Sequence, residues 1–234
     1  MFQDTINKLS LDEKVQLVSG ASAWRTVPIP GAGVPEMKVS DGPNGVRGDG
    51  GVAAASFPVG ICMASTWNVD LVQQVGDAIA DEAKSKGVQV VLGPTINIHR
   101  GPLGGRNFEC YSEDPYLSGM LASAFTDGVQ TAGVAACVKH YVCNDSEFER
   151  HTISVEVDER TLREIYLRPF EIAIKRSNPW TIMGAYNRVN GVYACSHDYL
   201  INQVLRSEWG YDGLVISDWY AAKETVPNGL GGLD

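Results

Sequence analysis

A repeated alternation of short apolar runs with longer amphipathic segments constrains this chain more than any other feature. Each apolar run ends in polar residues and a turn-rich loop, and an amphipathic segment then leads into the next run. This period is typical of βα units, which place parallel strands in one sheet and cover it with helices. The predicted strands lie at 37–41, 60–65, 88–92, 134–140, 180–186 and 213–218, and the predicted helices at 69–86, 115–131, 158–176 and 198–208.

Several helix ends have local signals. Ser10 and Glu13 form a capping-box pattern, which predicts a short helix directly after Ser10. Asp114 precedes a proline at a first helical position, so a helix is predicted to begin there. Gly87 and Gly133 follow predicted helices, where a left-handed residue is needed to end them.

Polar side chains gather where the predicted strands end. Asp41, the pair Lys139 and His140, Tyr186 and Asp218 all occupy such positions. In a (β/α) barrel these strand ends meet around one pocket, so residues far apart in the sequence converge. An open, doubly wound sheet also binds ligands at strand C-termini. The pattern therefore predicts a pocket but leaves both architectures open.

Composition limits the class of protein and of partner. With 234 residues and 44% hydrophobic residues, one α/β domain is expected. The net charge of −9 disfavours nucleic acid and acidic membranes, so a neutral substrate fits better. No signal peptide or apolar span is evident, which favours a soluble, cytoplasmic protein. The five cysteines lack metal-ligand spacing and His99 lies in no zinc motif, so neither metal nor disulfides are expected.

Two strand ends carry candidate reactive groups. Asp218 follows an apolar strand and precedes Trp219, a pairing that suits a carboxylate nucleophile beside an apolar platform for a sugar face, although Asp218 would also serve as a helix N-cap. Lys139 and His140 would donate hydrogen bonds to hydroxyls if a turn brings both side chains inward, because consecutive strand residues normally point apart. Lys139 alone would suit a Schiff-base enzyme, and a surface lysine beside a core histidine is the alternative without function.

Asp41 and Arg106 lie in glycine-rich turns. The Asp41 carboxylate suits acceptance of two sugar hydroxyls or stabilisation of an Asx turn. The Arg106 guanidinium suits a fork over hydroxyls, or an ion pair with Glu109 or Glu113.

Taken together, these segments closely resemble the N-terminal catalytic domain of glycoside hydrolase family 3, in its β-glucosidase branch. The resemblance covers nearly the whole chain, and five motifs occurring in the family's order make it specific. The motifs are Ser40–Arg47, Gly104–Glu109 with Ser112–Pro115, Lys139–Tyr141, Ala185–Asn187 and Ser217–Trp219.

The resemblance implies a TIM-like (β/α)8 barrel over residues 1–234 and assigns a role to each matching residue. Asp218 matches the nucleophile, and Tyr186 matches a residue beside it. Met183 and Trp219 look like apolar walls. Sugar hydroxyls would be held by the residues matching Asp41, Arg106, Lys139 and His140.

The implied reaction is hydrolysis of terminal β-D-glucosyl residues from β-glucosides with retention, without a metal or organic cofactor. In similar enzymes the acid/base is a glutamate on a following α/β-sandwich domain, which residues 1–234 do not contain. We therefore expect a truncated chain with an incomplete barrel and little turnover. The segment 142–151 lacks the Asp-x-His spacing of the single-domain N-acetylglucosaminidases. Its charged residues would either line the rim of the pocket or form a solvated loop; they are Glu147, Glu149, Arg150 and His151. A noncatalytic sugar-binding barrel and a Lys139 Schiff-base lyase are the remaining alternatives.

Overall fold

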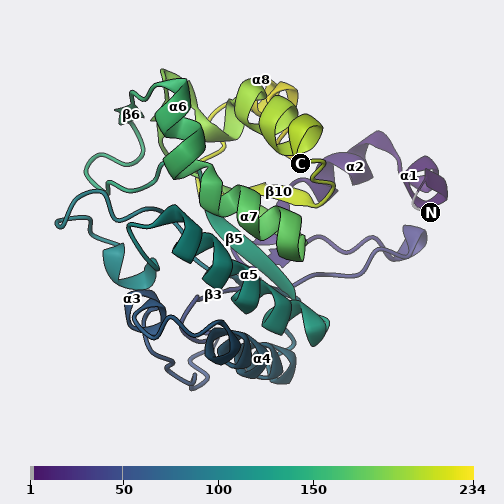
Figure 1. The fold of residues 1–234 in the computed structure, drawn as a ribbon. Helices are drawn as coiled ribbons and strands as arrows, with labels where there is room; N and C mark the ends of the chain where they lie inside the picture. Colours follow the sequence, from purple (N-terminus) through teal and green to yellow (C-terminus); the bar gives the residue numbers. More distant parts are fainter. Residues whose placement is uncertain (1–2, 49) are drawn as a thin grey trace.

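A parallel sheet forms the centre of the computed structural model, which describes residues 3–48 and 50–234. Within these residues the sheet has five strands in the order β10-β7-β5-β4-β3 (Figure 1). Every pairing is parallel. The strands are β3 (Val39–Asp41), β4 (Val90–Leu92), β5 (Ala135–Tyr141), β7 (Thr181–Gly184) and β10 (Leu214–Ser217).

The strand order decides between the two architectures that the sequence left open. Each strand pairs with the next parallel strand along the chain, so the order never reverses as it does in a doubly wound sheet. With right-handed crossovers, an order of this kind puts the helices on one side of the sheet, as in a (β/α) barrel. The prediction of a TIM-like, incomplete barrel is confirmed, because in the described residues the sheet stays open between β3 and β10.

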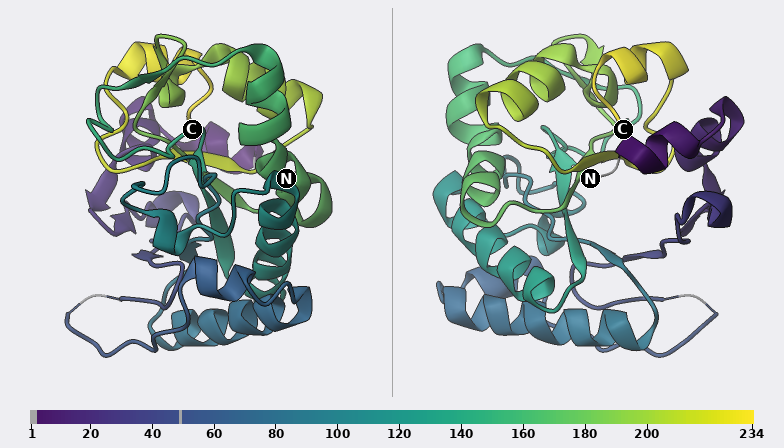
Figure 2. Two further views of the ribbon diagram at one scale, coloured as in Figure 1. Left: turned by 60° about the vertical axis from the view of Figure 1, so that its left-hand side comes forward. Right: turned by 90° about the vertical axis from the view of Figure 1, so that its right-hand side faces the viewer.

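The helices α4 (Val69–Ser85), α5 (Pro115–Thr131) and α7 (Arg168–Ser177) pack side by side along the outside of the sheet (Figures 1 and 2). The main hydrophobic core lies between them and the strands, and it includes Phe125 of α5 and Ile182 of β7. A helical segment at Tyr199–Glu208 precedes β10. The chain thus forms consecutive βα units, as the alternation in the sequence predicted.

Local signals set several helix ends as predicted. The Ser10 hydroxyl accepts a bond from the Glu13 amide, and the Glu13 carboxylate accepts one from the Ser10 amide, at the start of α2 (Leu11–Leu17). Asp114 accepts bonds from two amides in the first turn of α5. Gly87 and Gly133 have φ values of 63° and 81°, the left-handed conformation expected after a helix.

The strand predicted at 60–65 is wrong, because this segment forms helix α3 (Gly60–Ala64). Its buried residues are Gly60, Met63 and Ala64, which follow the i, i+3, i+4 spacing of a helix. A Cβ on Gly60 would lie 2.2 Å from the carbonyl oxygen of Glu109, so the helix packs closely against that backbone. A short apolar run does not by itself distinguish a strand from a buried helix.

The helix predicted at 158–176 exists but is interrupted. It consists of α6 (Glu159–Thr161), a π-helical turn at Leu162–Tyr166, and α7. Pro169 has no amide hydrogen to donate to the preceding turn, and its ring crowds the carbonyl there, which accounts for the break in regular α-helical bonding.

Short elements complete the chain. The N-terminal arm, which comprises α1 and α2, projects from the body at the right of Figure 1. The remaining elements are α1 (Gln3–Lys8), β1 (Gly20–Ser22), β2 (Arg25–Thr26), β6 (Ser154–Val155), β8 (Arg188–Val189), β9 (Val192–Tyr193), α8 (Thr225–Leu230) and 3-10 turns at Pro30–Ala32, Asn107–Glu109 and Ala194–Ser196.

Candidate active site

A cavity of about 200 Å³ lies at the C-terminal edge of the sheet. All eight residues singled out in the sequence line it, although they come from five separate segments of the chain. Two further residues, Trp24 and Arg150, also contribute to its wall. The residues predicted from the sequence are Asp41, Arg106, Lys139, His140, Met183, Tyr186, Asp218 and Trp219.

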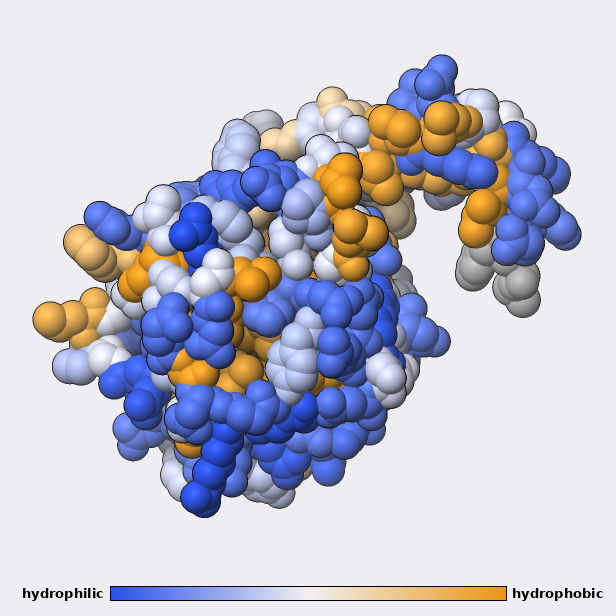
Figure 3. Space-filling view, turned by 90° about the horizontal axis from the view of Figure 1, so that it is seen from above, coloured by the Kyte–Doolittle hydropathy of each residue, from blue (hydrophilic) through white to orange (hydrophobic). Residues whose placement is uncertain are grey.

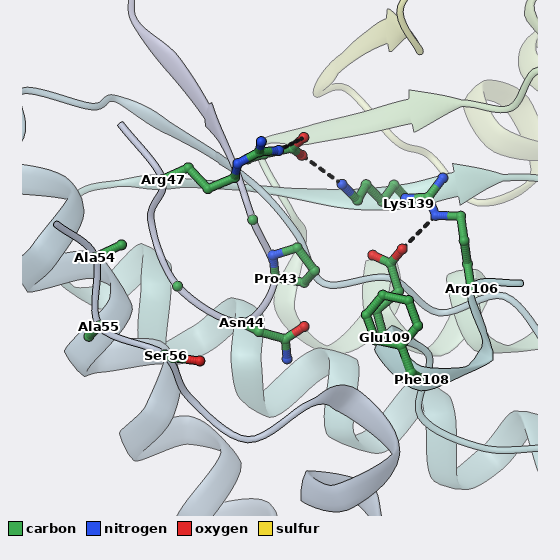
Figure 4. A pocket seen from close by; sticks show the side chains of 13 residues that line it. Pro43, Asn44, Arg47, Ala54, Ala55, Ser56, Arg106, Phe108, Glu109 and Lys139 are labelled. Atoms are coloured by element: carbon green, nitrogen blue, oxygen red, sulfur yellow. Dashed lines mark hydrogen bonds and ion pairs between the residues drawn. The ribbon is translucent and has the colours of Figure 1, made fainter. Parts of the chain in front are cut away.

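A larger hollow of about 490 Å³ adjoins this cavity and shares Asp41, Arg106 and Lys139 with it. Figure 4 shows the hollow, with Phe108 on one side and the loop that carries Pro43 and Asn44 on the other. The shared residues place both spaces along one wall of charged side chains. The smaller cavity therefore continues into a wider recess.

Asp218 is the buried carboxylate of the cavity, with 7% of its surface exposed. Its amide donates to the carbonyl of Gly184 at 3.0 Å, which extends the pairing of β10 with β7 by one residue. Its Oδ1 accepts the amide hydrogen of Trp219 at 2.7 Å. Asp218 is not a helix N-cap, because the next helix, α8, begins at Thr225 after Glu224. Its Oδ2 lies 3.4 Å from Nε2 of His140.

Burial raises the pKa of the Asp218 carboxyl above its ordinary value. Hydrogen bonds from the Tyr186 hydroxyl and the Trp219 amide, and the charges of Lys139 and Arg106, oppose this rise. Burial raises the pKa of the Tyr186 hydroxyl. The contact between Asp218 and Tyr186 raises the pKa of the tyrosine further but lowers that of the aspartate. Tyr186 thus stays a neutral donor beside the carboxylate.

Lys139 and His140 both line the cavity despite being consecutive on β5. The pairing of β5 with β7 shifts register between Lys139 and Tyr141, which breaks the strict alternation of side chains at this strand end. Nζ of Lys139 lies 3.1 Å from Oδ1 of Asp41, and Arg47 approaches the other oxygen of Asp41 at 3.7 Å. Figure 4 shows Lys139 and Arg47 on the same side of the adjoining hollow.

His140 is a buried, uncharged side chain, unlike the neighbouring Lys139. It is 1% exposed, and burial together with the charges of Arg106, Lys139 and Arg150 lowers its pKa well below the ordinary value. The imidazole is therefore neutral at neutral pH. It packs against the carboxylate of Asp218 as a polar but uncharged neighbour.

Arg106 forms an ion pair with Glu109 and also lines the cavity. The sequence had offered an ion pair and a place in the binding site as alternatives, and the two are compatible. Its Nε donates to Oε1 of Glu109 (Figure 4), and the other oxygen of Glu109 accepts from the Thr95 hydroxyl at 2.8 Å. Burial lowers the pKa of Arg106, but the bond to Glu109 and the charges of Glu109, Glu147 and Asp218 outweigh it. The guanidinium is thus a fixed cation.

Trp24 is a site residue that the sequence did not single out, whereas Arg150 was one of the candidates for the pocket rim. The guanidinium of Arg150 lies 4.6 Å from the ring centroid of Tyr186, and its Nη1 binds Glu147 at 2.7 Å. The rings of Trp24 and Trp219 are 5.1 Å apart, and Nε1 of Trp219 donates to the carbonyl of Ala23. Neither residue lies at the end of a predicted strand, so the pattern of polar strand ends did not include them.

The described residues contain no group of three or more His, Cys, Asp or Glu side chains placed to hold a metal ion. The same part of the chain has no helix that is long and apolar enough to cross a bilayer. The cysteines are all free thiols.

Comparison with known proteins places this geometry in a family. The sequence profile described as the glycosyl hydrolase family 3 N terminal domain matches residues 6–229. A β-glucosidase from Rhizobium radiobacter is 52% identical over 238 residues, which cover 100% of this chain and 29% of that protein. The chain thus spans less than a third of this relative's length.

Solved structures agree with this assignment. The β-glucosidase from Kluyveromyces marxianus in complex with glucose has a TM-score of 0.98 at 46% identity, covering 100% of this chain and 28% of the other. The β-glucosidase 3B from Thermotoga neapolitana in complex with glucose has a TM-score of 0.93 at 45% identity, covering 98% and 35%. The fold, the five motifs and the family profile agree, and this chain belongs to glycosyl hydrolase family 3.

Proposed function

We propose that this chain supplies the nucleophile and the sugar-binding subsite for hydrolysis of terminal β-D-glucosyl residues from β-glucosides. The observation that carries the proposal is the buried Asp218 carboxylate, set at a strand end in a cavity bounded by cations and tryptophan rings. The relatives named as β-glucosidases and the glucose bound to similar proteins support the choice of sugar.

The cavity offers complementary groups to a sugar ring. Arg106, Lys139 and Arg150 are hydrogen-bond donors, and Asp41 accepts bonds through its carboxylate. Trp219 and Met183 give apolar surface suited to the C–H face of a pyranose. A neutral polyol matches this mixture better than an anion or an apolar ligand.

The proposed reaction has two displacements at the anomeric carbon. Oδ2 of Asp218 attacks this carbon while its bond to the leaving oxygen breaks and that oxygen gains a proton. Water then attacks the same carbon, the bond to Asp218 breaks, and the water gives up a proton to a base. Oδ1 stays bound to the Trp219 amide, which orients the carboxylate.

The second carboxyl group is not evident in the cavity. Among the described residues that line it, the carboxylates are Asp41 and Asp218, and Asp41 pairs with Lys139. A retaining mechanism needs an acid/base about 5 to 5.5 Å from the nucleophile. We assign residues 1–234 to the N-terminal catalytic domain and propose that the acid/base belongs to a C-terminal domain of the whole protein, since the matched relatives are more than three times as long.

Two alternatives make different predictions. A Schiff-base lyase needs the free amine of Lys139, which here lies in an ion pair with Asp41 and is disfavoured as a nucleophile. A noncatalytic sugar-binding barrel needs the same hydroxyl contacts but no reaction at Asp218. Covalent chemistry at Asp218 therefore separates the proposal from both.

The test is incubation of the chain with an activated 2-deoxy-2-fluoro-β-glucoside, followed by intact mass measurement and peptide mapping. We expect one fluoroglucosyl group on Asp218 and none in Asp218→Asn. A folded chain that binds glucose but takes up no label would favour the sugar-binding barrel. Trapping of a carbonyl substrate on Lys139 by borohydride would favour the lyase.

A further inference from the structure

Asn97 holds the backbone of His140 from a separate loop that follows β4. Its Nδ2 donates to the carbonyl oxygen of His140 at 2.9 Å, and its Oδ1 accepts from the His140 amide at 3.0 Å. A flipped amide would set donor against donor and acceptor against acceptor in both contacts. The two backbone bonds therefore fix which end of the Asn97 side chain is oxygen.

The same oxygen determines the tautomer of the imidazole. Nδ1 of His140 lies 3.0 Å from Oδ1 of Asn97. Because Oδ1 can only accept a hydrogen bond, Nδ1 must carry the proton. His140 is neutral, so Nε2 carries none and is an acceptor.

Nε2 lies at the wall of the cavity, 3.4 Å from Oδ2 of Asp218. Two acceptors at this separation cannot satisfy each other. The protein surrounds His140 and Asp218 on every other side, since His140 is 1% and Asp218 7% exposed, so their partner must come from the cavity. A ligand that brings a hydrogen-bond donor to this point finds two acceptors there, Nε2 of His140 on β5 and Oδ2 of Asp218 directly after β10.

We propose that Asn97 is a positioning residue that keeps His140 in its Nδ1–H tautomer, so that Nε2 accepts the proton of a substrate hydroxyl beside the nucleophile. The identity of the ligand as a sugar rests on the proposed function, whereas the tautomer does not. His140 would therefore accept a hydrogen bond from a substrate hydroxyl, whereas the sequence predicted that it would donate one. A ligand that brings no hydrogen-bond donor to this point leaves Nε2 unpaired, so we expect it to bind more weakly than the hydroxyl-bearing ligand.

The tautomer is measured by long-range ¹H–¹⁵N correlation spectra of the chain labelled with ¹⁵N-histidine. His140→Gln identifies the His140 signals by their loss. We expect the pattern of a protonated Nδ1 and a bare Nε2 in the unaltered chain. The pattern of a protonated Nε2, or of an imidazolium at neutral pH, would overturn the proposal without any variant of Asn97.

Asn97→Leu removes the acceptor, and we expect the proton to move to Nε2, where it donates to Asp218. Thr181→Val is the matched control, because it deletes an equally buried side-chain bond, to the carbonyl of Ala136, at the opposite end of the sheet. The control should leave the tautomer unchanged. A folded Asn97→Leu chain that keeps the Nδ1–H pattern would contradict the role given to Asn97.

Glucose titration separates this inference from the proposed function. We expect the Kd for glucose to rise about tenfold in Asn97→Leu, as for the loss of one hydrogen bond, and to change by less than about twofold in Thr181→Val. If Asn97→Leu changes the tautomer but leaves glucose affinity intact, acceptance of a sugar hydroxyl by Nε2 is refuted. If the unaltered chain shows the tautomer but binds no glucose, the proposed function fails while the tautomer assignment stands.

Discussion

For Asp218, the protonation state that favours the fold differs from the one that the proposed reaction requires. Burial raises its pKa, so the folded chain binds the proton of this carboxyl more tightly than the unfolded chain does. Ionisation of Asp218 therefore destabilises the fold, an effect that appears as the pH rises above 3.8 and is complete above the raised pKa. The charged form that attack on a sugar requires is the form that the fold disfavours.

The Asp218→Asn variant is expected to raise the melting temperature at neutral pH by a few degrees, because it removes this ionisation. Thermal unfolding followed by circular dichroism measures the change. Asp41→Asn is the control with the opposite sign, since it leaves the buried ammonium of Lys139 without its partner and should lower the melting temperature. A lower melting temperature for Asp218→Asn would show that its contacts with Tyr186 and Trp219 outweigh the cost of burial.

The rate of labelling at Asp218 should fall in acid. Only the carboxylate attacks, and the raised pKa means that protonation begins at a higher pH than for an exposed aspartate. We expect half of the maximal labelling rate at a pH above 3.8, with the chain still folded by circular dichroism. A midpoint at or below 3.8 would mean that the site does not raise this pKa.

At the scale of elements, the contact between α4 and α5 depends on two glycines. A Cβ on Gly128 would lie 2.2 Å from the carbonyl oxygen of Gln73, and one on Gly76 would lie 2.6 Å from that of Phe125. These atoms belong to helix backbones, which cannot rotate away as a side chain can. The close approach keeps the outer helices against the strands whose ends carry the site.

Gly128→Ala should therefore destabilise the chain by about 1–3 kcal/mol through overpacking. Gly229→Ala is a matched control, because Gly229 is an exposed helical glycine with no atom within 4 Å of an added Cβ. Alanine there should be neutral or stabilising by up to about 1 kcal/mol. Urea unfolding of both variants checks the pair, and equal stabilities would refute the importance of the helix contact.

At the scale of the whole molecule, apolar side chains are exposed on the N-terminal arm, and the sheet of the described residues does not close. The N-terminal arm exposes Leu11, Val15 and Val18. Figure 3 shows hydrophobic surface on the part that projects at the upper right. The strands β3 and β10 end the sheet within the described residues. Among the described residues that line the cavity, the carboxylates are Asp41, which pairs with Lys139, and Asp218, which we propose as the nucleophile.

Turnover should consequently depend steeply on the leaving group. A missing general acid typically costs about 10²- to 10⁴-fold, but a dinitrophenolate leaves without protonation. We expect rapid formation of the glycosyl-enzyme with 2,4-dinitrophenyl β-glucoside, almost none with methyl β-glucoside, and faster turnover when azide is added, since azide attacks without a base. Stopped-flow absorbance measures the first step, and similar rates for both glucosides would place an acid within this chain.

The sequence by itself determined those features that depend on neighbours along the chain. The capping box at Ser10, the left-handed glycine at Gly87 and the apolar strand before Asp218 follow from local hydrogen bonds and side-chain periodicity. The polar strand ends predicted one pocket because parallel strands converge at that edge, and the family resemblance then selected the barrel.

The tertiary structure alone decided what depends on contacts between distant segments. The helix α3 (Gly60–Ala64) exists because its apolar side faces the body of the protein, which a short apolar run does not reveal. Trp24 reaches the site through a contact with Trp219, 195 positions away, and Asn97 sets the proton of His140 from 43 positions away. Periodicity records which side of an element is buried, but it carries no information on which distant atom lies opposite, and the charge and tautomer of a buried group depend on that atom.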